Sequence, residues 1–245
     1  MIENSVFISG SISIKTLPPE VKESIDKIVD NQMEILVGDA NGIDSLVQDY
    51  CFSLSYFNVT VYSISSLPRQ SASDKFALKT ITVPSEIKGG RERQQEKDKA
   101  MTKDGQYSFV IWDGKSKGSY ANVNRAFEQD KKVKLYAENR FLEQSEINQE
   151  NIEAIYRKNS GYTAFEVVQQ LKNIFNRTQD LNRYLLQNSI IKKDNDVYQP
   201  MSKYEDLFIV DRYRGRVKGI KFRSEFLGWI EGSLKSDRIV QGGLF

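Results

Sequence analysis

Short apolar runs alternate with helical patterns over the first half of the chain. Apolar and β-branched residues dominate segments 5–9, 35–37, 59–64, 109–112 and 133–136, which predicts buried strands. Between these runs, apolar residues recur at helical spacing after Pro19, from Ile43 to Leu54 and from Val123 to Phe127. This alternation predicts an α/β fold in which right-handed crossovers build a Rossmann-like parallel sheet with flanking helices. Residues 65–79 are irregular and polar, and we expect a loop there.

Residues 89–104 are almost purely polar, yet no helix breaker follows Gly90. The simplest interpretation is a helix with a solvated, charged face. Arg93, Lys97 and Met101 share one face of that helix, which leads into the strand at 109–112. The alternative is that this face presents a cation to a ligand.

The alternation stops after residue 138, and we predict a domain boundary there. Residues 139–159 are acidic and amide-rich, which is typical of a linker or connecting helix. Thr163 and Glu166 form a capping-box pattern before a short helix, a second helix follows Thr178, and turn residues near 195 predict a hairpin over 190–198. This order predicts a small α+β, winged-helix-like domain at 160–235, followed by a flexible tail at 236–245. Small helical domains that bind no DNA show the same order.

Glycine-bearing turns follow three of the predicted strands. Gly10 ends the first strand, residues 38–44 follow the second, and the stretch 109–124 runs from a strand through Gly114 and Gly118 to Ser119, a natural N-cap. The carboxyl ends of parallel strands meet at one edge, and helix N-termini attract anions. The turns therefore predict a phosphate-binding site, although an ordinary strand-to-helix connection also favours Gly and Ser.

Composition narrows the chemistry. The 245 residues include no histidine, which excludes Ser-His-Asp and Cys-His catalysis and histidine-containing zinc sites. The single cysteine, Cys51, cannot form an intramolecular disulfide, and we expect it in the core. The 35 basic and 33 acidic residues nearly balance, so any nucleic-acid site must be local. Neither a long apolar segment nor a signal-peptide pattern is present, so we expect a cytoplasmic protein without membrane contact.

One local charge cluster lies near the C-terminus. It contains six basic residues without an intervening acid: Arg212, Arg214, Arg216, Lys218, Lys221 and Arg223. Tyr213 and Phe222 are interleaved with them, and basic residues with aromatics suit phosphate contacts and base stacking. The cluster therefore predicts a DNA contact. The alternative is a solvated strand pair whose arginines pair with the acids at 206, 211 and 225.

Three segments together resemble the SLOG superfamily, the Rossmann-like nucleotide-binding domains that include DprA and the LOG phosphoribohydrolases. Gly10-Ser11 lies at the position of the family's first ligand loop. Residues 38–44 are similar to the DprA pattern Gly-x-Ala-Arg-Gly-Ile-Asp, with Asn41 in place of the arginine. Residues 97–122 follow the layout of the LOG signature. The resemblance covers roughly the first 136 residues.

The departures from the family concern the catalytic positions. The LOG signature Gly-Gly-x-Gly-Thr-x-x-Glu ends in a glutamate that assists N-glycosidic cleavage, and Asn122 stands in its place here. Lys97 replaces the paired arginine. An amide cannot act as general acid or base. The resemblance therefore implies binding rather than LOG-type hydrolysis, although Asp39, Asp44, Asp98 and Asp113 stay open as carboxylates for another substrate pose.

We expect a sensor whose N-terminal domain, residues 1–138, binds a nucleotide or nucleotide-derived ligand without a required cofactor and couples this to DNA or partner binding by the C-terminal domain. The expected ligand-binding residues are Gly10, Ser11, Gly38, Asp39, Ala40, Asn41, Gly42, Asp44, Arg93, Lys97, Trp112, Asp113, Gly114, Lys117, Gly118, Ser119 and Asn122. One alternative is a nucleoside or nucleotide N-glycosidase or deoxyribosyltransferase-like hydrolase, with Asp39 and Asp113 as candidate carboxylates. The other is a DprA-like single-stranded DNA-binding protein. The resemblance also implies a homo-oligomer and fits sensing in prokaryotic defence against phage.

Overall fold

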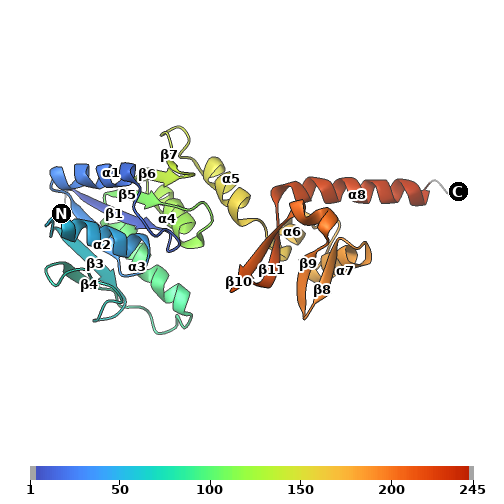
Figure 1. Cartoon of the computed structure of the whole chain (residues 1–245), viewed down its shortest axis with the longest axis horizontal. Coiled ribbons are helices and arrows are strands. Elements are labelled where there is room, and N and C mark those ends of the chain that lie inside the picture. Colours follow the sequence, from blue (N-terminus) through green and yellow to red (C-terminus); the bar gives the residue numbers. More distant parts are fainter. Residues whose placement is uncertain (1–3, 243–245) are drawn as a thin grey trace. The chain divides into compact units, whose positions relative to one another are not determined.

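The computed structural model describes residues 4–242, except the side chains of Tyr213 and residues 235–242. The chain divides into two compact units, residues 1–152 and 153–245, and the division falls within helix α5 (Gln149–Ser160). Figure 1 shows the elements of both units along the chain.

A seven-stranded sheet forms the centre of the N-terminal unit, as the α/β prediction requires. Its spatial order is β4-β3-β2-β1-β5-β6-β7, and every neighbouring pair is parallel except β6 with β7. The strands are β1 (Ser5–Gly10), β2 (Glu34–Gly38), β3 (Val59–Ser63), β4 (Ala77–Thr80), β5 (Tyr107–Ile111), β6 (Lys132–Ala137) and β7 (Arg140–Phe141).

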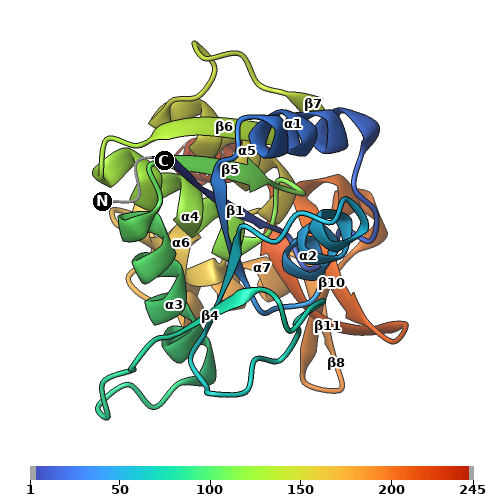
Figure 2. The same ribbon diagram turned by 90° about the vertical axis from the view of Figure 1, so that its left-hand side faces the viewer.

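Helices cover both faces of this sheet, because alternate strand residues are apolar on both sides. They are α1 (Pro19–Asp30), α2 (Ile43–Ser53), α3 (Gly90–Asp104) and α4 (Lys117–Glu128). Figure 2 shows α1 and α2 on one side of the sheet and α3 and α4 on the other. On the first side, Ile8 of β1 packs in a cluster with residues of α1 and α2, whereas Phe7 on the other side packs with Met101 of α3. Cys51 is buried in the first cluster, which confirms its predicted core position.

Three details differ from the sequence predictions. Strand β4 lies at the end of the segment expected to be a loop, and its four residues are all exposed, so it lacks the apolar pattern of a buried strand. Strand β7 lies in the expected linker and pairs with β6. Helix α4 begins at Lys117 with Ser116 as N-cap, so Ser119 lies in its first turn and is not the N-cap.

The C-terminal unit has the helix, helix, hairpin order of the winged-helix-like prediction. After α5 come α6 (Ala164–Gln170), α7 (Thr178–Gln187), β8 (Ile191–Asp194), β9 (Val197–Pro200), η1 (Ser202–Leu207), β10 (Phe208–Tyr213), β11 (Arg216–Phe222) and α8 (Ser224–Gly242). Thr163 and Glu166 form the predicted capping box. Leu181, Leu185 and Phe226 are fully buried in the core of this unit. Helix α8 includes residues 236–242 of the predicted tail, and residues 243–245 lie outside the described residues.

Strand β1 is the topological switch point of the sheet. The chain continues to β2 on one side of β1, whereas β5 pairs on its other side, with Gly10 opposite Ile111. The amide of Ser11 donates to the carbonyl oxygen of Ile111 at 3.0 Å, so the two strand ends are tied together. Open α/β sheets bind ligands in the crevice outside such a switch point. Across residues 4–242, no helix is both long and apolar enough to cross a membrane.

Candidate functional site

A cavity of about 300 Å³ lies between α3, the first turn of α4 and the carboxyl ends of β1 and β2. Its lining residues are Phe7, Ser9, Gly10, Ile12, Ala40, Asp44, Arg69, Arg91, Gln94, Gln95, Lys97, Asp98, Met101, Ser116, Gly118, Ser119 and Asn122. Seven of the predicted ligand residues are among them: Gly10, Ala40, Asp44, Lys97, Gly118, Ser119 and Asn122. The structure therefore brings parts of all three predicted turns, and the predicted cationic face of α3, to one cavity.

A buried ion pair forms one wall of the cavity. The Nζ atom of Lys97 donates to Oδ1 of Asp39 at 2.8 Å, and both side chains are almost fully buried. Lys97 therefore points toward the strand ends, where its charge is paired within the protein, and presentation of this cation to a ligand stays a prediction. Gly38 permits this approach, since a Cβ at that position would lie 2.8 Å from Nζ of Lys97.

Both oxygens of Asp39 are occupied within the protein. Besides Lys97, its carboxylate accepts from the Ser63 hydroxyl at 2.9 Å and from the Arg69 amide, Nε and Nη2 atoms at 3.1, 3.2 and 2.6 Å. Burial raises the pKa of Asp39, but the hydrogen bonds from Arg69 and the charge of Lys97 outweigh it and hold the pKa well below its ordinary range. Asp39 therefore anchors the loop after β3 through Arg69. Its carboxylate is poorly placed to take up a proton or to accept a hydrogen bond from a ligand hydroxyl.

Asp44 is the less saturated carboxylate beside the same lysine. Its Oδ2 atom accepts from the Ala40 amide at 3.1 Å and lies 3.9 Å from Nζ of Lys97. Burial raises the pKa of Asp44 more strongly than Lys97 lowers it, and the charge of Asp98 raises it further, to about 6. Asp44 thus supports the second loop and is also able to exchange a proton near neutral pH.

Asp98 lines the cavity from the next position of α3. Its Oδ2 atom lies 3.8 Å from Nη2 of Arg125, and that nitrogen also donates to Oδ1 of Asn122. Burial raises the pKa of Asp98 despite the charges of Lys97 and Arg125. Asn122, at the position of the family's glutamate, is thereby held by an arginine and faces the cavity beside a second carboxylate.

The first turn of α4 supplies the anion-binding groups. Helix geometry leaves the amides of Lys117, Gly118 and Ser119 without intrahelical acceptors, and the helix dipole adds positive potential there. Asp113 is turned toward the same helix end, where its Oδ1 atom accepts from the amides of Lys115 and Ser116 at 3.1 and 2.7 Å. Burial raises the pKa of Asp113, but hydrogen bonds from Ser13 and the Ser116 amide lower it below its ordinary value. Asp113 therefore shapes the loop before α4.

Trp112 supports this loop from below. Its ring is buried, and its Nε1 atom donates to the carbonyl oxygen of Ser116 at 3.1 Å. Because the ring does not line the cavity, the structure places Trp112 behind the site and not against a ligand.

Sequence reasoning missed two polar side chains of the cavity. The Ser9 hydroxyl, on a residue only 3% exposed, has no hydrogen-bond partner among the described residues, and neither has the Oε1 atom of Gln94. Both residues line the cavity. A buried polar atom without a partner costs stability unless a ligand or water satisfies it. The sequence feature that could have indicated Ser9 is a polar residue that follows the apolar run of β1 and directly precedes Gly10.

The other predicted ligand residues lie outside the cavity lining. Ser11 is buried, and its hydroxyl accepts from the Asp113 amide at 3.1 Å and lies 3.2 Å from Oγ of Ser119, so it ties two loops together. Asn41 is exposed, and Nη1 of Arg93 donates to the carbonyl oxygen of Ile87 at 3.2 Å. Lys117 lines a separate hollow between α3 and α4. Two glycines shape turns at positive φ, Gly42 at 80° and Gly114 at 76°.

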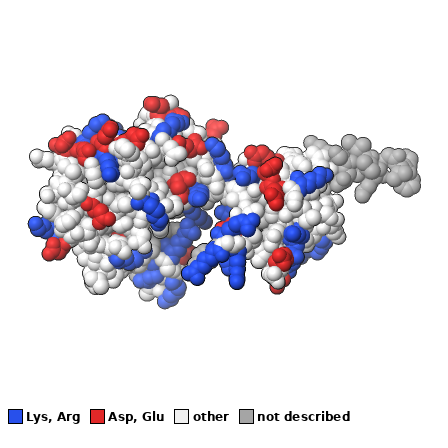
Figure 3. All heavy atoms as spheres, in the orientation of Figure 1, with Lys and Arg blue, Asp and Glu red and all other residues white. Residues whose placement is uncertain are grey.

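The six basic residues of the predicted DNA contact lie on or beside the β10–β11 hairpin. Arg212, Arg216 and Lys218 are exposed, and among the described residues no ion pair is recorded for them or for Lys221. Nε of Arg223 donates to the carbonyl oxygen of Phe208 at 3.2 Å. Figure 3 shows Lys and Arg side chains gathered over this hairpin. The alternative interpretation, in which these side chains pair with the acids at 206, 211 and 225, is therefore not supported for Arg212, Arg216, Lys218 and Lys221 within the described residues.

Arg216 and Lys218 also line a hollow of about 490 Å³ between this hairpin and the β8–β9 hairpin. Asp194 lines the same hollow, so its charge is mixed. Within the described part of the chain, no group of three or more Cys, Asp or Glu side chains is placed to hold a metal ion.

Comparison of the chain with models of known protein families and with curated proteins finds no match. Arguments about function therefore rest on the geometry of the site.

The raised pKa of Asp44 predicts how stability depends on pH. Between about pH 4, where an ordinary aspartate ionises, and about pH 6, the folded protein keeps a proton that the unfolded chain has lost, so the free energy of unfolding falls as pH rises. Asp44→Asn removes this dependence, because the amide oxygen still accepts from the Ala40 amide and carries no charge. We therefore compare the free energy of unfolding of the variant with that of the unsubstituted protein at each pH. This difference should be about 2 kcal/mol more favourable to the variant at about pH 7.5 than at about pH 4.5.

Urea denaturation at the two pH values measures this gain. Asp49→Asn, an exposed substitution on the same helix, is the control and should leave the pH dependence unchanged. A constant difference between Asp44→Asn and the unsubstituted protein at both pH values would contradict the prediction.

Proposed function

We propose that the N-terminal unit binds a nucleotide or nucleotide-derived ligand in the α3–α4 cavity. The observation that carries the proposal is the unpartnered, buried Ser9 hydroxyl at the β1–β5 switch point, in the same cavity as the first turn of α4. The amides of Gly118 and Ser119 suit a phosphate, and the arginines at 69 and 91 add positive charge to the rim. Asp44 and Asp98 suit the hydroxyl or N–H donors of a ribose and base. The SLOG resemblance is consistent with this assignment.

A test can use methionine methyl groups as local reporters. The chain has four methionines, and among the three that the structure describes, Met33, Met101 and Met201, Met101 alone lines this cavity. With ¹³C-methyl methionine, we expect AMP, ATP or NAD to shift the Met101 signal and to raise the melting temperature. Adenosine, which lacks the phosphate, should bind at least about tenfold more weakly because the α4 amides lose their anion. A Met101 signal unchanged by every phosphorylated nucleotide at millimolar concentration would overturn the proposal.

Two serine substitutions provide a matched pair for this experiment. Ser9→Ala removes the cavity hydroxyl and should weaken nucleotide binding about tenfold through the lost hydrogen bond. Ser108→Ala removes a hydroxyl that is equally buried and also unpartnered, on the neighbouring strand and outside this cavity, and should leave binding unchanged.

A second candidate function is hydrolysis of an N-glycosidic bond. Two carboxyl groups with raised pKa values, Asp44 and Asp98, line the cavity, and such pairs are typical of acid–base sites. Water would add across the bond between the sugar and the base, with one carboxylate taking the proton of the water and the protonated partner assisting departure of the base. We favour this pair over Asp39 and Asp113 as the candidate carboxylates, because the oxygens of Asp39 and Asp113 already accept hydrogen bonds within the protein.

Chromatography of NAD and nucleotides after incubation with the protein tests this candidate. If bond cleavage occurs, free base accumulates, and Asp98→Asn should reduce its release at least about a hundredfold, as expected for a general acid or base. Asp113→Asn should retain most of the release because Asp113 binds amides of the loop before α4 and does not line the cavity. Binding without released base would leave the ligand-binding proposal and exclude hydrolysis of the substrates tested.

We further propose that the β10–β11 hairpin contacts DNA phosphates and that ligand binding alters this contact. The exposed side chains of Arg212, Arg216 and Lys218, which form no ion pair with the described residues, support the first part. The second part requires that the nucleotide have different affinity for two states of the protein. A cytoplasmic location, a homo-oligomer and a role in phage defence stay predictions from the sequence and its resemblance.

Fluorescence anisotropy with short single- and double-stranded oligonucleotides tests the DNA contact. Replacing both Arg216 and Lys218 by serine should weaken binding and reduce the slope of log K against log salt by about 2, one for each lost phosphate contact. The control replaces Arg177 and Arg183, which both pair with Asp180, and should have a smaller effect. Affinity and salt slope that are unaffected by the Arg216 and Lys218 changes would contradict a contact by this hairpin and favour the N-terminal unit as the DNA site.

A further inference from the structure

A second cavity of the N-terminal unit lies at the opposite edge of the sheet. It has a volume of about 470 Å³ and is bounded by α1, the turn before β2 and the amino ends of β1, β5 and β6. Volumes of this size are common for small-molecule sites. Its lining residues are Asn4, Val6, Ser24, Lys27, Ile28, Asn31, Met33, Tyr107, Ser108, Phe109, Lys132, Val133 and Lys134, so it shares no residue with the α3–α4 cavity.

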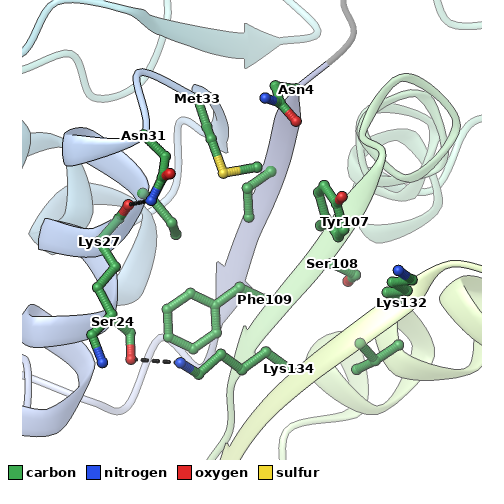
Figure 4. A pocket seen from close by; sticks show the side chains of 13 residues that line it. Asn4, Ser24, Lys27, Asn31, Met33, Tyr107, Ser108, Phe109, Lys132 and Lys134 are labelled. Carbon is green, nitrogen blue, oxygen red and sulfur yellow. Dashed lines mark hydrogen bonds between the residues drawn. The ribbon is translucent and has the colours of Figure 1, made fainter.

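The walls of this cavity combine apolar side chains with positively charged ones. Val6, Ile28, Met33 and Phe109 provide apolar side chains, and Figure 4 shows the Phe109 ring between α1 and β6. Among the described residues of the lining, three are lysines and none is an aspartate or glutamate. No ion pair is recorded for these lysines among residues 4–242.

Two of the lysines converge on one corner of the cavity. Figure 4 shows Lys27 from α1 and Lys134 from β6 reaching toward Ser24, and Nζ of Lys134 donates to the Ser24 hydroxyl at 2.8 Å. Nζ of Lys134 also lies 4.4 Å from the centroid of the Phe141 ring, which helps to hold the ammonium group in place. Burial lowers the pKa of Lys134, and the charge of Lys27 lowers it further. The two ammonium groups therefore repel each other, and a bound anion would relieve that repulsion.

We propose that this cavity binds a small organic anion with an apolar body, such as a medium-chain carboxylate. The anionic group lies between Lys27 and Lys134 beside the Ser24 hydroxyl, and the apolar body packs on the partly exposed Met33 and Ile28, with the buried Phe109 ring behind them. The site is separate from the nucleotide site, so this inference stands whether or not a nucleotide binds in the α3–α4 cavity.

Octanoate is a suitable probe, with two comparison compounds. Octan-1-ol has the apolar body without the charge, and propionate has the charge with a much shorter body. Calorimetry should give one octanoate site per chain, with a dissociation constant at least about tenfold lower than for either comparison compound, because both charge and apolar burial are needed. Equal affinity for octanoate and octan-1-ol, or for octanoate and propionate, would overturn the proposal.

Methionine methyl signals locate the binding. Octanoate should shift the Met33 signal and leave Met101, in the other cavity, unchanged, whereas a nucleotide should do the reverse. Saturation by octanoate without a shift of Met33 would place the ligand elsewhere and refute the site. Because each cavity contains its own methionine, failure of one proposal is visible separately from failure of the other.

Charge substitutions complete the experiment. Replacing both Lys27 and Lys134 by glutamine should weaken octanoate binding at least about tenfold, and a cooperative thermal unfolding transition shows that the double variant is folded. Lys22→Gln, on α1 outside the cavity, is the matched control and should bind octanoate normally. Lys27→Gln alone is the substitute if the double variant fails to fold, with a smaller but measurable loss of affinity. Unchanged octanoate affinity in the folded variants would refute the proposal.

Discussion

The ion pair between Asp39 and Lys97 is the constraint on which the N-terminal site depends. Burial of a charged carboxylate or ammonium group costs several kcal/mol unless partners replace the lost water. Here, one carboxylate at the end of β2 collects hydrogen bonds from β3, from the loop that follows it and from α3. Strand β3 with its following loop is distant in sequence from α3, and their shared hydrogen bonds to Asp39 tie both to the end of β2. The cavity is a consequence of that arrangement, because its wall is the helix that carries Lys97.

This constraint separates residues that build the site from those that are available to a ligand. Asp39, Ser11, Trp112 and Asp113 each use their polar atoms within the protein, so they shape loops. In contrast, Ser9 and Gln94 have unpartnered atoms. The amides of the first α4 turn likewise lack intrahelical acceptors. Asp44 and Asp98 are intermediate between these two groups. Asp44 lies 3.9 Å from the ammonium group of Lys97, Asp98 lies 3.8 Å from the guanidinium group of Arg125, and both carboxyl groups have raised pKa values. The ligand therefore meets mostly neutral donors and two carboxyl groups with raised pKa values around a helix N-terminus.

The two cavities of the N-terminal unit differ in how their charges are balanced. At the carboxyl edge, Lys97 is neutralised by Asp39, and the remaining positive potential comes from backbone amides and the rim arginines. At the amino edge, Lys27 and Lys134 have no recorded carboxylate partner within the described residues and lie beside an apolar surface. The first arrangement suits a phosphorylated polar ligand, whereas the second suits an anion with an apolar body.

Much of the fold was predictable because hydrophobic periodicity reports directly on burial. The apolar runs at 5–9, 35–37, 59–64, 109–112 and 133–136 are all strands of one sheet, and Thr163 with Glu166 caps α6 as expected. Strand β4 was not predictable, since an edge strand with four exposed residues has no apolar pattern. The sequence alone also determined that the glycine turns share one edge of the sheet. Only the tertiary structure decided which polar atoms at that edge are consumed by partners and which face a cavity, because hydrogen-bond saturation depends on segments such as Arg69 and Lys97 that periodicity cannot place in space.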